Sequence, residues 1–351
     1  MKIDHPYYFA VGIGTKNRRN QWLEVYYPEP LSLKRPETIK AIRDKFVDKA
    51  VKDTVGITIE LNPDETGEIE ALFLDDPEQN RIRELIHQIK SSKHPLVLCL
   101  IDPRSDPAQV PDIYLRLHLL SHRLVKPHEI NLNGIFGKLH NIAWTNRGAV
   151  DLSELRELQL EVRLKGEYLS VNSVDKFPKM TDYVVPAGVR IADTARVRLG
   201  AYIGEGTTIM HEGFVNFNAG TIGPNMIEGR VSAGVIIGEG TDLGGGCSTM
   251  GTLSGGNETV IAVGKNCLIG ANAGLGIPLG DRCTIEAGLY LTGGSKVTVF
   301  DLKGTPTETV KASKLAGKSD LLFRRNSLNG AIECLTNKSS IELNEVLHKN
   351  N

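Results

Sequence analysis

The sequence has few cysteines, and no two of them form a Cys-x-x-Cys pair. A disulfide framework and a structural zinc site are therefore not expected. The five cysteines are predicted to be buried free thiols in a reducing cytoplasm. The N-terminus also lacks an apolar run long enough for a signal peptide or a membrane span. We therefore expect a cytoplasmic protein that does not enter a membrane.

An excess of charge of either sign is also missing, since the formal net charge is -1. This balance speaks against a nucleic-acid binder and against a general membrane-surface binder. Aromatic residues are sparse at 6%, whereas glycine is abundant with 36 residues. Such a composition favours an architecture with many tight turns and thin layers. The 351 residues suffice for two or three domains with a sizeable core.

The first third of the chain has the patterns of a mixed α/β domain. Apolar residues at helical spacing predict helices at 37–50, 80–91, 112–124 and 152–163, the last one capped by Asp151 or Ser153. The apolar run at 96–101 predicts a buried strand.

From near residue 180 the sequence repeats every six residues. Small residues and glycine fill most positions between one aliphatic residue and the next. A first run in one phase comprises Val185, Ile191, Val197, Ile203, Ile209 and Val215. A second run comprises Val231, Ile237, Leu243, Ile261, Cys267, Ala273, Leu279, Ile285, Leu291 and Val297, with Thr249 and Gly255 in the same phase.

A period of six fits neither a helix nor an ordinary strand, and it predicts a solenoid of short strands and corners. One residue per hexapeptide then points inward and stacks on its counterpart in the next coil. The two runs do not join, because Val231 lies ten residues after Thr221. We therefore expect the coil to be interrupted within 221–230, in a loop on the binding face.

Longer motifs accompany the repeat. They are LHLLSHRLV at 117–125, SVDKFPKMTDYVVPAGVRIAD at 173–193, MHEGFVNFNAG at 210–220, MIEGR at 226–230, DLGGGCS at 242–248 and LFRRNS at 322–327. Together they resemble the tetrahydrodipicolinate N-succinyltransferases of the longer bacterial type, which belong to the hexapeptide-repeat acyltransferases. The resemblance extends from about residue 112 to the C-terminus and is weak before residue 80.

The resemblance implies a homotrimer and a left-handed parallel β-helix at 173–300. An N-terminal α/β domain at 1–172 and a C-terminal cap at 301–351, with a short helix near 340–348, complete the expected fold. The implied reaction transfers succinyl from succinyl-CoA to the amine of L-2-amino-6-oxopimelate, the ring-opened form of tetrahydrodipicolinate. This step belongs to lysine and diaminopimelate synthesis. The implied partners are small-molecule substrates.

Glu228 matches the family's catalytic carboxylate, which is described there as forming an acyl-anhydride intermediate. It also lies in the interruption of the repeat, where a side chain need not face the interior. A solvated surface acid is the alternative. The residues leave open whether Glu228 acts as a nucleophile or as a general base.

The resemblance assigns a further set of residues to succinyl-CoA. Glycine and alanine in this set suit a close approach of the ligand, and the cations suit phosphates or carboxylates. Plain solenoid corners and solvated surface residues explain the same positions without a ligand. The set comprises Arg230, Gly245, Ser248, Ala271, Glu286, Ala287, Gly294, Lys311, Arg324, Arg325, Asn326 and Ser327.

Glu212 matches a family position that binds magnesium at the trimer axis, and three copies of it could supply the ion. The second acid found in some relatives is replaced here by Ala195. His211 is the single histidine of the solenoid, and a hydrogen-bonded structural role is favoured over that of a catalytic base.

Three other functions remain open at this point. The first is a sugar or serine O-acyltransferase that uses His211 as its base. The second is a γ-type carbonic anhydrase, although its three histidine ligands are lacking. The third is a non-catalytic solenoid, which would not be expected to pair Glu228 with Arg230 in an interruption.

Overall fold

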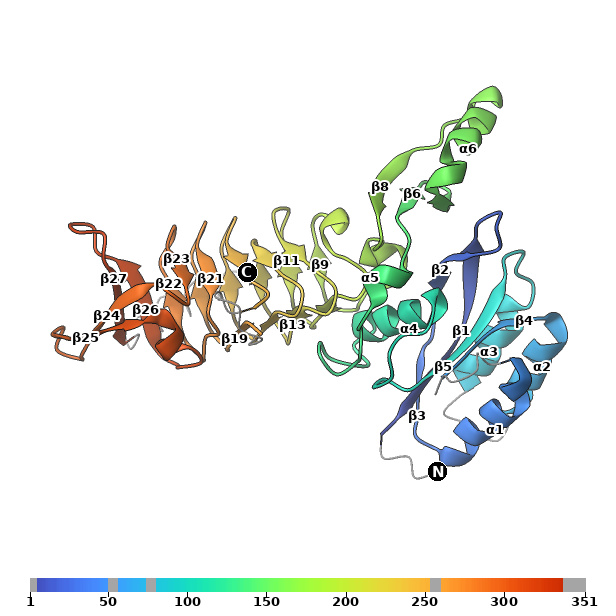
Figure 1. Ribbon diagram of the computed structural model, residues 1–351, viewed down its shortest axis with the longest axis horizontal. Coiled ribbons are helices and arrows are strands. Elements are labelled where there is room, and N and C mark those ends of the chain that lie inside the picture. Colours follow the sequence, from blue (N-terminus) through green and yellow to red (C-terminus); the bar gives the residue numbers. More distant parts are fainter. Residues whose placement is uncertain (1–4, 50–55, 74–79, 253–259, 337–351) are drawn as a thin grey trace. The chain divides into compact units, whose positions relative to one another are not determined.

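The computed structural model describes residues 5–49, 56–73, 80–252 and 260–336. The chain divides into two compact units, which Figure 1 shows in ribbon form. We call the first the N-terminal unit; it consists of Met1–Leu119, Glu129–Pro178 and Asp182–Val184. We call the second the solenoid unit; it consists of Leu120–His128, Lys179–Thr181 and Val185–Asn351. Within the described ranges, no helix is long and apolar enough to cross a membrane.

The N-terminal unit is built on a five-stranded antiparallel sheet in the order β2-β1-β5-β4, with β3 beside β1. Its central strand β5 is buried along its whole length, as the apolar run predicts. The strands are β1 (Tyr7–Lys16), β2 (Trp22–Tyr26), β3 (Leu31–Leu33), β4 (Ile57–Leu61) and β5 (Leu96–Ile101).

Helices α1 (Pro36–Phe46), α2 (Pro63–Ala71) and α3 (Asn80–Ile89) cover one face of this sheet (Figure 1). A single-turn 3₁₀ helix, Val47–Lys49, follows α1. On the other face, the Tyr27 hydroxyl contacts Cys99 Sγ at 3.0 Å and donates to the carbonyl of Pro111 at 3.1 Å. Pro111 belongs to α4 (Val110–Ser121). The helices predicted near 37–50, 80–91 and 112–124 are thus confirmed.

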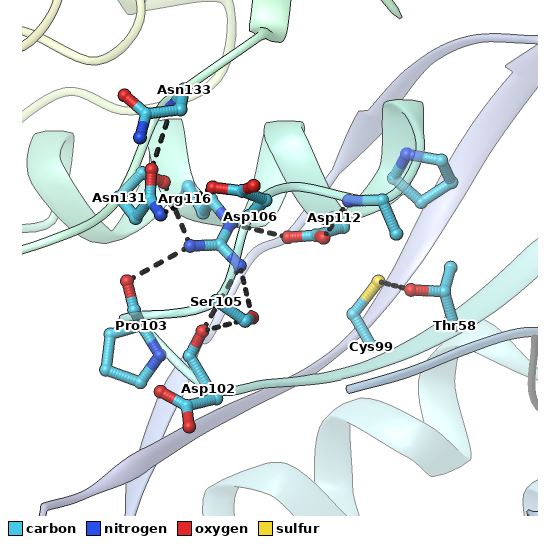
Figure 2. Close-up of polar contacts among 12 residues, drawn as sticks. Thr58, Cys99, Asp102, Pro103, Ser105, Asp106, Asp112, Arg116, Asn131 and Asn133 are labelled. Atoms are coloured by element: carbon cyan, nitrogen blue, oxygen red, sulfur yellow. Dashed lines mark hydrogen bonds and ion pairs between the residues drawn. The ribbon is translucent and has the colours of Figure 1, made fainter. Parts of the chain in front are cut away.

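Arg116 of α4 is fully buried and organises the polar interior of the N-terminal unit (Figure 2). Its Nε donates to Asp112 at 2.7 Å, one turn earlier on the helix. Its terminal nitrogens donate to the carbonyls of Asp102, Pro103 and Asn131 and to the Ser105 hydroxyl. A buried guanidinium is tolerated here because these oxygens replace the water it has lost.

A second, three-stranded sheet lies in the same unit, in the order β7-β6-β8. Asp151 caps α6 by accepting from the Ser153 backbone N–H at 2.8 Å, which confirms the predicted helix and its start. The elements are α5 (Ile135–Lys138), β6 (Ile142–Thr145), β7 (Gly148–Asp151), α6 (Leu152–Leu164) and β8 (Val171–Asp175).

The coils of the solenoid unit consist of two- and three-residue strands that pass in turn to three sheets, where the strands of successive coils pair in parallel (Figure 1). The first face has β9 (Arg190–Ile191), β11 (Thr208–Ile209), β14 (Met226–Ile227), β17 (Asp242–Leu243), β20 (Leu268–Ile269) and β22 (Thr284–Ile285). The second face has β12 (Phe214–Val215), β15 (Arg230–Val231), β18 (Ser248–Thr249), β21 (Gly274–Gly276) and β23 (Tyr290–Thr292). The third face has β10 (Tyr202–Ile203), β13 (Gly220–Thr221), β16 (Ile236–Ile237) and β19 (Ala262–Val263).

The expected inward residues from Val197 onwards are buried wherever the structure describes them. Val185 is an error in the first run, since it is 72% exposed. It precedes the first paired strand β9, so no neighbouring coil covers it. Gly255 lies outside the described residues.

The interruption of the repeat falls within the predicted range, but it is a shortened corner and not a loop. Thr221 and Ile227 keep the phase of the first run and are buried. Val231 then follows Ile227 after four residues, so only Glu228 and Gly229 connect β14 to β15. Ile227 consequently pairs with Leu243, sixteen residues on, whereas Ile209 pairs with Ile227, eighteen residues on.

The second run needs a correction of phase. The residues that pair with Ile237, Leu243 and Thr249 are Val263, Ile269 and Leu275. The members of the expected run, Ile261, Cys267 and Ala273, each lie two positions before these paired residues, although they too are buried. A second four-residue step, from Leu275 to Leu279, restores the phase, because Leu279 bridges to Val263.

The C-terminal strands close the solenoid. β26 (Leu321–Arg325) pairs in parallel with β22 and places Phe323 above Ile285 as a further inward residue. β24 (Lys296–Phe300), β25 (Pro306–Lys311) and β27 (Ile332–Thr336) complete the ten-stranded sheet of the first face. Further 3₁₀ helices are Met180–Asp182, Thr194–Arg196 and Ala312–Leu315. The helix expected near 340–348 lies outside the described residues.

Candidate active site

Glu228 lies on the shortened corner between the first and second faces. Its backbone N–H donates to the carbonyl of Leu243 at 2.8 Å, which fixes it to the next coil. The adjacent Gly229 has no room for a side chain, because a Cβ there would collide with Cys247 Sγ. The half-buried Glu228 carboxylate makes no hydrogen bond or ion pair with any other described residue. It is therefore available to a ligand.

The thiol beneath this corner does not compete with Glu228 as a nucleophile. Cys247 is only 1% exposed. Burial, followed by the negative charges of Asp242 and Glu228, raises the pKa of Cys247 to about 12. At neutral pH the group is a protonated thiol inside the coil, and thiols react as thiolates.

Gly245 brings two carboxylates together. A Cβ at this position would lie 3.5 Å from Glu212 Oε2 and 3.5 Å from Glu228 Oε2. The two carboxylate oxygens are therefore no farther apart than twice that distance. Because Gly245 has no side chain, the space between the carboxylates of Glu212 and Glu228 is left open on its side.

The neighbouring glycines show which of these residues the corner itself requires. A Cβ on Gly244 would come within 2.7 Å of the backbone nitrogen of Ala271, and Gly246 has a left-handed φ of 69°. Gly245 has neither restriction, since its Cβ would make only ordinary contacts. Ala271 carries a Cβ at the equivalent position of the next coil. The backbone geometry thus requires glycine at positions 244 and 246, but it does not require glycine at position 245.

Half of the residues assigned to succinyl-CoA continue along the same edge of the solenoid. We define the Glu228 edge as the two residues that directly follow the first-face strands β14, β17, β20 and β22, together with the last two residues of β26, which continue the same register. Five coils contribute to it, and with about 4.8 Å between strands it is about 19 Å long. In order, these residues are Glu228 with Gly229, Gly244 with Gly245, Gly270 with Ala271, Glu286 with Ala287, and Arg324 with Arg325.

Arg324 and Arg325 are tied to this edge by other side chains. The Arg325 backbone N–H donates to Glu286 Oε2 at 2.6 Å. Arg324 Nε donates to Glu333 Oε2 at 2.8 Å, and Asn326 Nδ2 donates to Glu333 Oε1 at 2.8 Å. Glu333 was missed from the sequence, because only the β26–β27 hairpin brings it opposite Arg324.

A second group of residues occupies the outer surface of the second face. Arg230, Ser248, Gly274 and Tyr290 follow one another in register. The Tyr290 ring lies over Gly274, where a side chain would collide with ring atoms, and Tyr290 is 47% exposed. Tyr290 was also missed, since a single outward tyrosine leaves no periodic signal.

Gly294 and Lys311 do not belong to the Glu228 edge. Gly294 lies in the turn that follows β23, and Lys311 is the last residue of β25, opposite Lys296 of β24 in the strand register. Their neighbours are joined, because the Ala312 backbone N–H donates to the carbonyl of Ser295 at 2.9 Å. Ser327 occupies the exposed turn after β26.

The donors for magnesium are incomplete within one chain. Glu212 offers an exposed carboxylate, but no three His, Cys, Asp or Glu side chains of the described part come together. Arg196 next to Ala195 donates to the backbone carbonyl of Glu212 at 2.9 Å, which brings a positive charge close by. His211 is exposed and has no hydrogen-bond partner among the described residues of one chain, so the hydrogen-bonded role favoured from the sequence stays a prediction.

The chain is similar to known proteins. Residues 139–179 match the family model "Tetrahydrodipicolinate N-succinyltransferase middle", and residues 260–293 match "Hexapeptide repeat of succinyl-transferase". The 2,3,4,5-tetrahydropyridine-2,6-dicarboxylate N-succinyltransferase of Pseudomonas putida is 61% identical over 97% of this chain and 98% of its own length. The enzyme of the same name from Vibrio cholerae is 54% identical over 98% and 99%.

A solved structure is also similar. It comes from Campylobacter jejuni and carries the assignment 2,3,4,5-tetrahydropyridine-2-carboxylate N-succinyltransferase. It shares 32% sequence identity and a TM-score of 0.86, over 97% of this chain and 94% of that one.

The protein is therefore an acyltransferase of the hexapeptide-repeat class. Within that class, the chain belongs to the tetrahydrodipicolinate N-succinyltransferases. This membership confirms the resemblance stated from the motifs, and it favours an N-acyltransferase over the O-acyltransferase, the carbonic anhydrase and the non-catalytic solenoid.

Proposed function

We propose that the chain transfers succinyl from succinyl-CoA to the amine of L-2-amino-6-oxopimelate, in lysine and diaminopimelate synthesis. The observation that carries this proposal is the unpartnered Glu228 carboxylate at one end of an edge that leads to Arg324 and Arg325. Such an edge suits a donor with an acyl group at one end and phosphates at the other. Gly245 and Ala271 leave room for the arm between them.

Glu228 acts in one of two ways. As a nucleophile, its oxygen attacks the thioester carbonyl, the C–S bond breaks and CoA leaves as a thiolate that takes up a proton. The acceptor amine then attacks the anhydride, the amide forms, the Glu228 carboxylate is released and the amine gives up its proton. As a general base, Glu228 removes that proton while the amine attacks the thioester directly, the C–S bond breaks and CoA leaves as a thiolate that takes up a proton.

The cations have separate roles in this proposal. Arg324 and Arg325 bind phosphates of CoA, and Arg230 binds a carboxylate or phosphate from the second face. Lys311, with Gly294, adds a contact at the corner after β23, where a neighbouring chain of a trimer would bring the ligand within reach. Ser248, Asn326 and Ser327 donate hydrogen bonds to the same ligand.

The assembly proposed for this function is a homotrimer of left-handed coils located in the cytoplasm. The buried free cysteines are compatible with a reducing compartment. A magnesium ion on the trimer axis would require Glu212 from all three chains, because one chain does not complete an octahedral set of oxygens. The proposed reaction steps do not involve this ion. The domain boundaries near 173 and 301 likewise stay predictions.

A turnover assay tests the proposal. Succinyl-CoA and acetyl-CoA are offered side by side with the amine acceptor and with hydroxyl acceptors. Succinyl transfer to the amine is expected to dominate, and Glu228→Gln is expected to reduce it about a hundredfold or more with CoA affinity unchanged. Near-normal turnover of this variant would contradict both roles of Glu228.

The two roles are separated by omitting the acceptor. A nucleophile releases up to one equivalent of CoA per site, and hydroxylamine traps the anhydride. A base gives no such burst, although Glu228→Gln is inactive in either case.

A further inference from the structure

Glu333 is a buried carboxylate whose two oxygens bind two residues of the proposed donor site. The residue is 5% exposed. Its Oε2 accepts from Arg324 Nε and its Oε1 from Asn326 Nδ2, both at 2.8 Å. Glu333 and Arg324 face each other across the antiparallel β26–β27 pair. One carboxylate thus fixes an arginine and an asparagine at the same time.

The partners differ from Glu333 in their exposure. The Arg324 side chain is 47% exposed, whereas that of Glu333 is 7% exposed. Because the bond engages Nε, the outer nitrogens of the guanidinium can still donate to a ligand. Asn326 is also held from its other side, since its Oδ1 accepts from the Leu328 backbone N–H at 2.9 Å.

The carboxylate is ionised in this arrangement. The Asn326 amide and the Arg324 guanidinium lower the pKa of Glu333, against the opposing effect of its burial. A charge-assisted bond of this kind is stronger than a neutral one and restricts the rotamers of a long side chain. A guanidinium that is already ordered loses less entropy when it binds a phosphate.

We propose that Glu333 is a positioning residue of the donor site, which orders Arg324 and Asn326 for the phosphates of CoA without touching the ligand. The inference rests on the proposed function, in which these two residues bind CoA. Glu333 acts through them, so its removal changes donor binding and leaves the chemistry at Glu228 intact.

The test is Glu333→Gln in the full-length enzyme. Glutamine keeps the shape of the Glu333 side chain. Its NH₂ group is a donor that faces either Arg324 Nε or Asn326 Nδ2, which are donors too, so one of the two hydrogen bonds is lost. We expect the KM for succinyl-CoA and the Kd for 3′,5′-ADP, a probe with phosphates and no acyl group, to rise about tenfold. The kcat at saturating donor and the KM for the acceptor stay within about twofold of the wild type.

A matched control is Asp320→Asn. Asp320 immediately precedes β26 and forms a two-bond ion pair with Arg282, at 2.6 and 2.8 Å, at the other end of that strand. Its φ of 60° is one that asparagine tolerates. This variant removes a charge from the same segment and is expected to leave the donor KM unchanged. Should Glu333→Gln not fold, Glu333→Asp keeps the charge, shortens its reach and is expected to weaken donor binding in the same way.

A double-mutant cycle with Arg324→Ala completes the experiment. If Glu333 acts through Arg324, its substitution has a smaller effect on donor binding once Arg324 is absent. Unchanged donor affinity in Glu333→Gln, or equal losses for donor and acceptor together with a lower Tm, overturns the inference. A wild-type enzyme that does not bind CoA contradicts the proposed function itself, whereas a loss in Arg324→Ala alone contradicts only the role of Glu333.

Discussion

Gly245→Ala is expected to separate stability from activity. The added methyl group would lie 3.5 Å from oxygens of Glu212 and Glu228, which is ordinary van der Waals contact. The backbone at Gly245 is not left-handed, so alanine is not strained there. Replacing glycine at such a position stabilises a protein by about 0.4–1 kcal/mol, because the unfolded chain loses freedom. The free energy of unfolding should therefore stay the same or rise.

Activity should change in the opposite direction. The methyl group occupies the space between the carboxylates of Glu212 and Glu228 and displaces an acyl group that approaches Glu228. A misplacement of about 1 Å at a reacting centre costs up to about a hundredfold in rate. We expect kcat/KM to fall by about ten- to a hundredfold, measured as initial rates with succinyl-CoA and the amine acceptor.

Gly246→Ala provides the matched control on the adjacent residue. Its φ of 69° is unfavourable for a side chain, and a left-handed alanine costs roughly 1–2 kcal/mol. Denaturant unfolding should show this variant destabilised while Gly245→Ala is not. The reasoning is refuted if Gly245→Ala keeps the wild-type kcat/KM, or if it loses as much stability as Gly246→Ala.

Three further predictions concern other parts of the molecule. Arg324→Ala is expected to weaken CoA binding more than acceptor binding in calorimetric titration, and an unchanged CoA affinity would leave the strand as a cap only. Light scattering of the dilute, active enzyme is expected to report three chains, so an active monomer would contradict the trimer. Arg116→Met is expected to cost about 3–5 kcal/mol of unfolding free energy, because it leaves Asp112 as a buried, unpaired charge; the double variant with Asp112→Leu should recover much of this loss in denaturant titration.

The solenoid was predictable because its stability comes from stacking like residues. Each coil pairs with its neighbours, so Ile209, Ile227 and Leu243 must repeat along the chain to fill one column. Val185 failed because periodicity identifies a residue type and not the presence of a neighbouring coil. The first coil of a stack has nothing on one side, and the sequence does not mark where that coil begins.

The error of phase in the second run has a different cause. Most strands of the solenoid have a second buried position two residues earlier. In the second run it is often apolar, as at Ile261, Cys267 and Ala273, whereas Thr241 occupies it before Leu243. Cys267 and Ile269 are equally buried, so hydrophobicity cannot distinguish the stacked residue from the earlier one. Val263 lies fourteen positions after Thr249, which is two more than two hexapeptides span. Leu279 lies only four positions after Leu275, which is two fewer than one hexapeptide spans. The two deviations cancel, so the six-residue period is continuous in the sequence.

The contacts of Glu333 and Tyr290 were not accessible from the sequence. Glu333 reaches Arg324 across a hairpin, and Tyr290 covers Gly274 from the next coil. Both contacts depend on which strands pair, and a single outward residue does not reveal strand pairing. Arg230 and Ser248 were found only through the family motifs, although they too are neighbours across strands.

The interruption of the repeat directed attention to Glu228, but the interruption alone does not define a site. The chain has a second shortened step between Leu275 and Leu279, and the residues in that step are glycine, isoleucine and proline, none of which ionises. Shortened corners are thus a property of this solenoid, and they change the length of a coil without supplying chemistry. What distinguishes the first corner is a carboxylate without a partner above Gly245, a glycine that the backbone does not require. A ligand site needs open space and an ionisable group that the protein's own donors do not occupy. The corner offers both, because the fold does not require glycine at position 245 and Glu228 has no partner. Gly245 therefore supports a ligand site at Glu228 more strongly than does the break in the period that first indicated it.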